Sequence, residues 1–177
     1  VRAELGIAAD APVVLFVGSG FGRKGVPVLL DALARLPAAV RLLVVGRDRR
    51  EVAMRKRAAH LGLASRVRFL GGQPDVRPFY GAADVFCLPT LYDPFPNAAL
   101  EALACGLPVV TSNDCGAAEL IREGANGAVC DALDATALAE RLAALCRPGA
   151  AAALGAAARE SVTGLDLATL AGRLAAL

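Results

Sequence analysis

The sequence predicts an α/β fold in which a parallel sheet is covered on both faces by helices. Its short Val-rich runs are apolar throughout rather than alternating, as strands buried on both faces are. Stretches with a helical pattern separate these runs, and Gly or Pro marks most of the boundaries. The 177 residues suit a single domain with a full core. We therefore expect a doubly wound, Rossmann-like parallel sheet.

The first half of the chain alternates strand and helix in a simple order. We expect buried strands at 12–17, 40–45 and 67–70, and helices at 26–36, 51–61 and 76–83. The Gly-rich run 18–22 follows the first strand, Gly46 ends the second strand, and Gly62 ends the second helix.

The second half continues the alternation with shorter strands. We expect strands at 84–88, 108–111 and, more weakly, 127–130. Helices are expected at 97–105, 116–122 and 135–146, and in two Ala- and Leu-rich stretches that reach residue 177, of which the first contains the Ala-rich patch 150–158. Ligands bind such sheets beyond the carboxyl ends of the strands, so the loops that follow the strands are the candidate site.

Composition and charge argue against several classes of function. A net charge of +2 does not indicate a nucleic-acid binder. Five Cys without a C-x-x-C pair and a single His, His60, argue against structural zinc. We expect Cys87, Cys105 and Cys130, which lie in apolar patterns, to be buried thiols of a protein in a reducing compartment.

No stretch of the sequence resembles a signal peptide or a transmembrane helix, because the apolar runs are short and broken by Gly, Pro or charge. We therefore expect a cytoplasmic protein, and peripheral contact with the inner face of the membrane stays open for the full-length protein. The chain begins at Val1 without Met and ends in a helical stretch, so we interpret it as a fragment of a longer protein.

The segment 93–106 carries the strongest functional signal. Asp93 precedes a predicted helix, two prolines turn the chain, and Glu101 follows about one turn inside the helix. A helix start carries free N–H groups and a partial positive charge, which favour a bound phosphate. Carboxylates repel phosphate, so Asp93 and Glu101 suit the sugar hydroxyls on either side of it. The segment therefore predicts a nucleotide-sugar site.

Both acids also have structural explanations. An Asp before a helix is a common N-cap, and a Glu near a helix start suits the helix dipole. Asp93, however, lies far before Asn97, which can itself serve as the cap. Glu101 lies in an otherwise apolar helix, where a charge must be paired, exposed or functional. We favour the functional interpretation of the pair.

The loop 18–25 is Gly-rich but fits neither the Gly-x-Gly-x-x-Gly fingerprint of dinucleotide binders nor the Walker pattern. It brings Arg23 and Lys24 to the ligand edge of the sheet. Arg can hold one phosphate with two hydrogen bonds while Lys supplies a mobile charge, so the pair suits a diphosphate. A solvated loop with incidental charge stays open as the alternative for this loop alone.

We predict structural roles for the other basic residues. We interpret the basic cluster 47–57 as a solvated helix face and His60 as a partner of the dipole at a helix end. With one His, the chain supports no Ser/His/Asp or Cys/His arrangement.

The motif residues resemble a pattern of the retaining, nucleotide-sugar-dependent glycosyltransferases of family 4, which have two Rossmann-like domains in the GT-B architecture. That family carries an acid-x7-acid motif, usually Glu-x-Phe-Gly-x4-Glu, followed by Ala-x-Ala-x-Gly-x-Pro-Val. Residues 93–101 match the first part and residues 102–109 the second. The loop 18–25 is similar to that of the lipopolysaccharide core glucosyltransferases. The resemblance covers nearly the whole chain and implies that residues 1–177 are the C-terminal, donor-binding domain, without the acceptor-binding N-terminal domain.

The resemblance also implies a role for each site residue. Glu101 would bind the donor ribose, Asp93 the transferred sugar, and Lys24 with the helix start the diphosphate. The loop 71–75 would hold the nucleobase. The residues implied as catalytic are Asp93, Arg23 and Lys24, and those implied as donor-binding are Glu101, Gly20, Gly22, Gln73, Phe95, Pro96, Asn97 and Ala98. No metal ligand is implied.

The sequence departs from the family pattern at three positions. Asp93 stands where Glu is usual and is one methylene shorter. Pro96 stands where Gly is usual and removes one backbone N–H from the phosphate site. Ser19 stands where Arg is usual, and Arg23 can replace that Arg.

From these residues we predict the donor-binding domain of a hexosyltransferase, inactive on its own. It would bind UDP-glucose or a similar donor without metal or cofactor, for transfer to a glycan or lipid-linked acceptor, and the cations with the helix dipole would stabilise the leaving diphosphate. Two alternatives stay open. One is a non-enzymatic nucleotide- or sugar-binding module with a degraded site. The other is a sugar-nucleotide epimerase of the same architecture, although that class would need a His-rich cleft and the chain has only His60.

Overall fold

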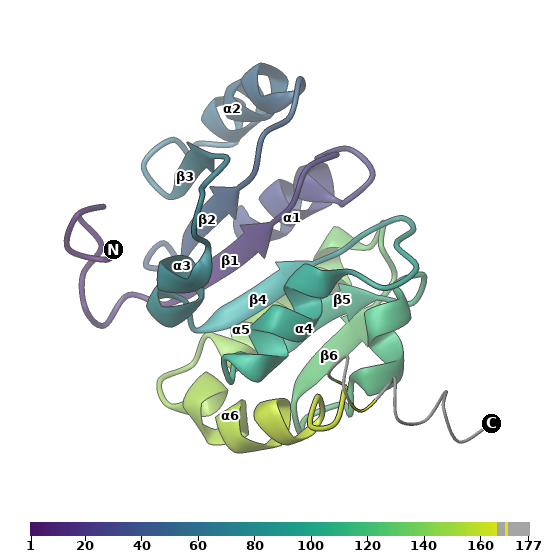
Figure 1. Ribbon diagram of the computed structural model, residues 1–177. Helices are drawn as coiled ribbons and strands as arrows, with labels where there is room; N and C mark the ends of the chain where they lie inside the picture. Colours follow the sequence, from purple (N-terminus) through teal and green to yellow (C-terminus); the bar gives the residue numbers. More distant parts are fainter. Residues whose placement is uncertain (166–168, 170–177) are drawn as a thin grey trace.

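One parallel sheet of six strands organises the protein (Figure 1). The computed structural model describes residues 1–165 and 169 of the 177-residue chain. The strands are β1 (Val13–Val17), β2 (Arg41–Val45), β3 (Val67–Gly71), β4 (Val85–Leu88), β5 (Val109–Ser112) and β6 (Gly127–Cys130), and they lie in the order β3-β2-β1-β4-β5-β6. All five pairings are parallel, so the predicted doubly wound α/β sheet is confirmed.

The middle of the sheet forms the core. β1 pairs with β2 along its full length and with β4 on its other side. Side chains of β1, β2 and β4 are buried on both faces, which explains why their sequences are apolar throughout. The strand order reverses at β1, with β2 and β3 on one side and the later strands on the other. In such sheets, ligands bind at the carboxyl ends of the strands where the order reverses.

Helices cover both faces of the sheet. They are α1 (Val26–Leu33), α2 (Glu51–His60), α3 (Arg77–Ala82), α4 (Asn97–Ala104), α5 (Ala135–Leu145) and α6 (Ala150–Glu160), with a 3₁₀ helix, η1 (Gly116–Leu120). Figure 1 shows α4 in front of the sheet and α1 with α5 behind it. α1 packs against α5, and α4 packs against α6.

Two predicted helices differ from the observed ones. The helix predicted at 26–36 ends at Leu33. The N–H groups of Arg35 and Leu36 then bond to carbonyls three residues earlier, in a tight turn before Pro37. Pro disfavours helical geometry in the residue before it, which accounts for this end. The segment 116–122 forms the short 3₁₀ helix η1 instead of a regular α-helix. The last predicted stretch falls mainly on residues outside those described.

The thiols differ from the prediction in one case. Cys87 and Cys130 are buried as expected, but Cys105 is exposed, because it is the C-cap residue just past the end of α4. All five Cys are free thiols. Across the residues described here, no helix is long and apolar enough to cross a membrane. The same residues include no group of three or more His, Cys, Asp or Glu side chains that could hold a metal ion.

Candidate functional site

The candidate site lies at the carboxyl ends of β1 and β4, where the strand order reverses. The loop 18–25 follows β1, and the loop 89–96 follows β4. Hydrogen bonds to one backbone carbonyl join them: the Leu91 N–H and the Thr90 hydroxyl donate to the Arg23 carbonyl at 2.8 and 3.2 Å. The sequence therefore brings its basic loop and its acidic motif into direct contact.

Gly25 makes this contact possible. Its φ is +81°, in the left-handed region, and a Cβ at this position would overlap the Pro89 carbonyl oxygen. Only glycine accepts both the backbone conformation and the close approach. Gly25 is also the N-cap residue of α1, so the same position starts this helix and fastens the loop to β4's end.

The two loops assemble a cluster of one acid and two cations. Asp93 Oδ2 lies 3.2 Å from Lys24 Nζ and 3.6 Å from Arg23 Nη1. Asp93 is 8% exposed, and a buried carboxylate needs such partners. Arg23 is half exposed and also donates to the Tyr92 carbonyl. The cluster carries one net positive charge at the edge of the sheet where ligands bind.

The backbone around Asp93 is fixed by the segment after β5. The Gly116 N–H donates to the Asp93 carbonyl at 2.9 Å, and the Asp93 N–H donates to the Asp114 carbonyl at 3.3 Å. A Cβ on Gly116 would overlap the Pro94 carbonyl oxygen. Three consecutive loops along the sheet edge are therefore tied to one another.

The start of α4 lies directly after these loops. Pro96 is the N-cap residue, so Asn97 is the first helical residue and does not cap the helix, which it was expected to be able to do. The side chain of this N-cap residue makes no capping hydrogen bond to the helix. The N–H groups of Asn97 and Ala98 belong to the first turn, which has no acceptor inside the helix. Phe95 is 44% exposed beside this start.

Glu101 is exposed on α4 but has a hydrogen-bond partner. The Tyr80 hydroxyl donates to Glu101 Oε2 at 2.8 Å and lies 3.2 Å from the Ala98 carbonyl oxygen. Tyr80 is 2% exposed, and burial together with the Glu101 carboxylate raises its pKa well above the usual range. The Tyr80 hydroxyl therefore stays a donor at neutral pH.

A second residue outside the predicted set, Asp48, holds the loop 18–25 in place. Its carboxylate accepts hydrogen bonds from the Phe21 N–H at 2.8 Å and the Arg50 N–H at 2.7 Å. Burial opposes ionisation of Asp48, but hydrogen bonds from the backbone of Arg50, Phe21 and Gly20 lower its pKa overall. The Arg50 side chain lies against Gly22, where a Cβ would overlap it.

The predicted nucleobase loop lies after β3 and is separate from the charge cluster. Gln73 is half-buried, and its amide donates to the Leu70 carbonyl at 2.7 Å. Arg47 packs over the same loop, with its Nε 3.0 Å from the position that a Cβ on Gly72 would take. Of the predicted residues, Arg23, Lys24 and Asp93 are in contact, whereas Glu101 and Gln73 bond to other groups.

The basic residues of the cluster 47–57 are exposed, as predicted for a solvated face, and two of them form ion pairs. Arg57 forms an ion pair with Asp31 at 2.6 Å, and Arg55 with Glu51 at 2.7 Å. The Arg55 guanidinium also lies 4.9 Å from the centre of the Phe69 ring. His60 is exposed in the last turn of α2, where a dipole partner was expected.

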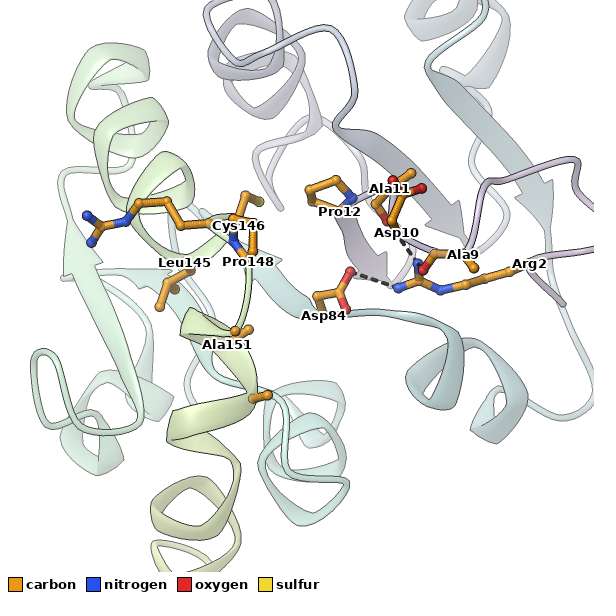
Figure 2. A pocket seen from close by; sticks show the side chains of 13 residues that line it. Arg2, Ala9, Asp10, Ala11, Pro12, Asp84, Leu145, Cys146, Pro148 and Ala151 are labelled. Carbon is orange, nitrogen blue, oxygen red and sulfur yellow. Dashed lines mark hydrogen bonds and ion pairs between the residues drawn. The ribbon is translucent and has the colours of Figure 1, made fainter.

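A separate cavity of about 390 Å³ lies at the opposite, amino ends of β1 and β4 (Figure 2). Arg2 and Asp84 line it and form an ion pair at 2.8 Å. Arg2 also donates to three backbone carbonyls, and Asp84 accepts from the Val13 N–H at 2.7 Å. Because the chain itself satisfies these polar groups, they fasten the N-terminal segment to the sheet. The candidate site therefore remains at the carboxyl edge.

Comparison with known proteins places this geometry in a family. The glycosyl transferases group 1 family matches residues 1–161. LpsE of Rhizobium meliloti (strain 1021), a lipopolysaccharide core biosynthesis glycosyltransferase, is 41% identical over 141 residues, which cover 80% of this chain and 41% of LpsE. These matches support the glycosyltransferase interpretation and lend no support to an epimerase or to a non-enzymatic module.

WaaG and HepE are among the solved structures that share the fold. WaaG, a glycosyltransferase involved in lipopolysaccharide biosynthesis, superposes with a TM-score of 0.87 and 33% identity, over 98% of this chain and 48% of that chain. Anabaena HepE, solved with UDP and glucose, superposes with a TM-score of 0.90 and 28% identity, over 99% of this chain and 51% of that chain. The chain thus spans about half or less of these relatives. By its sequence and by the fold that carries its acidic motif, the chain belongs to the glycosyl transferases group 1 family.

Proposed function

We propose that this chain is the donor-binding domain of a retaining glycosyltransferase and that it binds a UDP-sugar at the carboxyl edge of its sheet. The observation that carries the proposal is the contact of Lys24 and Arg23 with Asp93, directly before the start of α4. This arrangement sets positive charge beside an acid that suits sugar hydroxyls, in the loop that leads to the free N–H groups of a helix start.

The cations and helix N–H groups of the site suit the diphosphate part of the donor. Lys24 is mostly buried, with its stem against Gly18, where a Cβ would lie 3.0 Å from Lys24 Cδ. The ammonium group is therefore held beside Asp93, in the loop that leads into α4, before any donor binds. As the bond to the sugar breaks, charge grows on the leaving diphosphate, and preorganised cations and helix N–H groups stabilise it.

The sugar and nucleoside ends of the donor are assigned to different residues. Asp93 lies beside the diphosphate cations and is proposed to contact the transferred hexose. Glu101 on α4 is proposed to bind the ribose, and Gln73 in the loop after β3 the nucleobase. Support for uridine and glucose comes from HepE, whose structure holds UDP and glucose.

The activity of the whole protein is part of the same proposal. The relatives are about twice as long or longer, and we propose that the remaining length supplies an acceptor-binding domain for a glycan or lipid-linked acceptor. Transfer is proposed to need no metal. The five free thiols fit a reducing compartment, so the proposal includes a cytoplasmic location.

Isothermal titration calorimetry with UDP-, GDP- and ADP-sugars tests the proposal. We expect the chain to bind UDP-glucose and to bind UDP-sugars more tightly than GDP- or ADP-sugars. Lys24→Ala should weaken binding, whereas Lys56→Ala, which removes an exposed lysine on α2, should not. No binding of any nucleotide-sugar by the folded chain would contradict the proposal.

A further inference from the structure

Tyr80 links the predicted nucleobase side of the site to the second acid of the motif. It lies on α3, which begins right after the loop 72–76, and its hydroxyl donates to Glu101 Oε2 on α4 at 2.8 Å. We infer that Tyr80 is a positioning residue that orients the Glu101 carboxylate toward the donor ribose, and this inference rests on the proposed function.

The hydrogen bond matters because Glu101 is otherwise free to move. An exposed Glu on a helix samples several rotamers, and binding a ligand through it requires that one of them be selected. A bond from a fixed hydroxyl selects that rotamer before the ligand arrives, which improves affinity through preorganisation. The bond engages Oε2, so the carboxylate can present Oε1 to the ribose hydroxyls.

Tyr80 itself is a rigid anchor. It is 2% exposed, and its ring centre lies 6.1 Å from that of Phe86 on β4. The hydroxyl lies 3.2 Å from the Ala98 carbonyl oxygen, in the first turn of α4, so it is held close to the helix start as well as to the acid. A core aromatic ring thus fixes the direction of an exposed carboxylate.

Tyr80→Phe separates this role from packing, because it removes the hydroxyl and keeps the ring. The comparison uses UDP and 2′,3′-dideoxy-UDP, which lacks the ribose hydroxyls that Glu101 is proposed to bind. The variants are Tyr80→Phe, Glu101→Ala and their combination. Ser161→Ala is the control, since it removes a partly buried hydroxyl that donates to the Ala158 carbonyl on α6, away from the site.

We expect Tyr80→Phe to weaken UDP binding about threefold to tenfold, the cost of ordering one free side chain, and to leave dideoxy-UDP binding unchanged. In the Glu101→Ala background, Tyr80→Phe should have no further effect. Ser161→Ala should bind both nucleotides like the wild type.

Two outcomes overturn the inference and are distinguishable. If Glu101→Ala abolishes the preference for UDP over dideoxy-UDP but Tyr80→Phe leaves it intact, Tyr80 has only a packing role and the proposed function stands. If Glu101→Ala leaves the preference unchanged, the ribose assignment fails and the role of Tyr80 fails with it.

Discussion

At the residue scale, the site is built on opposite charges that already contact each other. Asp93 is a buried acid that holds Lys24 and Arg23 at 3.2 and 3.6 Å. A buried carboxylate without partners would be costly, so the two cations stabilise the loop that carries Asp93. The backbone of Asp93 is tied to Gly116 and Asp114, which keeps the acid at the sheet edge.

Replacing Asp93 distinguishes a role toward the sugar from a structural role. If Asp93 contacts the transferred hexose, Asp93→Ala should weaken UDP-glucose binding about tenfold to a hundredfold and leave UDP binding nearly intact. Asp93→Glu, which restores the residue usual in the family, should retain UDP-glucose binding. Calorimetry with both ligands, together with melting temperatures, checks this. Parallel losses for both ligands with a lowered melting temperature would show that Asp93 only holds the loop.

Replacing Lys24 tests the diphosphate contact. Lys24→Ala should weaken UDP binding by about 1.5 to 3 kcal/mol, the range for a hydrogen bond to a charged group. The loss should shrink at high salt, because dissolved ions screen the attraction between the ammonium group and the diphosphate. Titrations at low and high salt measure both effects, with Lys56→Ala as the matched control. An affinity equal to that of the wild type would remove Lys24 from the site.

At the scale of elements, three loops act together because backbone groups fasten them. Gly25 brings the loop 18–25 against Pro89, and Gly116 brings the segment after β5 against Pro94. The sequence predicted these loops as the candidate site, since each follows a predicted strand. It did not reveal Tyr80 or Asp48, because their contacts join residues 21 and 27 positions apart in the chain and depend on how α3, α4 and the loops pack.

Gly25→Ala tests the fastening of the loop. The change places a side chain in the left-handed region and against the Pro89 carbonyl oxygen, so it should destabilise the fold by at least about 2 kcal/mol. Gly62→Ala is the control, because Gly62 has φ +71° with open space around it, and should cost about 1 kcal/mol. Urea unfolding measures both. Equal losses would mean that the close approach at Gly25 contributes nothing.

Because Asp48 holds the loop 18–25 through hydrogen bonds to its carboxylate, we expect the stability of the fold to depend on pH. Hydrogen bonds lower the pKa of Asp48 in the folded state, so its contribution is present above the unfolded pKa of about 3.9 and is lost as pH falls through the lower folded value. Asp48→Asn should therefore be less stable than the wild type at neutral pH, with a difference that shrinks below pH about 4. Melting temperatures across this range check it. A difference in melting temperature between wild type and Asp48→Asn that stays constant with pH would contradict a stabilising role for the ionised Asp48 carboxylate.

At the scale of the whole molecule, the sequence predicted the architecture because strands buried on both faces are apolar throughout. Runs such as those of β1 and β4 therefore indicated a doubly wound sheet, and its reversal at β1 places the candidate site. The sequence did not reveal the cavity that Arg2 and Asp84 line, whose walls come from residues up to about 150 positions apart, from Arg2 to Ala152. The relatives' greater length leads to a further expectation, that this chain binds donor but transfers no sugar alone.

A crystal structure of this chain with UDP tests the central claim most directly. The account predicts the diphosphate within hydrogen-bond distance of Lys24 Nζ and of the N–H groups of Asn97 and Ala98, and the ribose hydroxyls at the Glu101 carboxylate. The Tyr80 hydroxyl should still donate to that carboxylate. UDP bound elsewhere, such as in the cavity beside Arg2 and Asp84, would contradict the account.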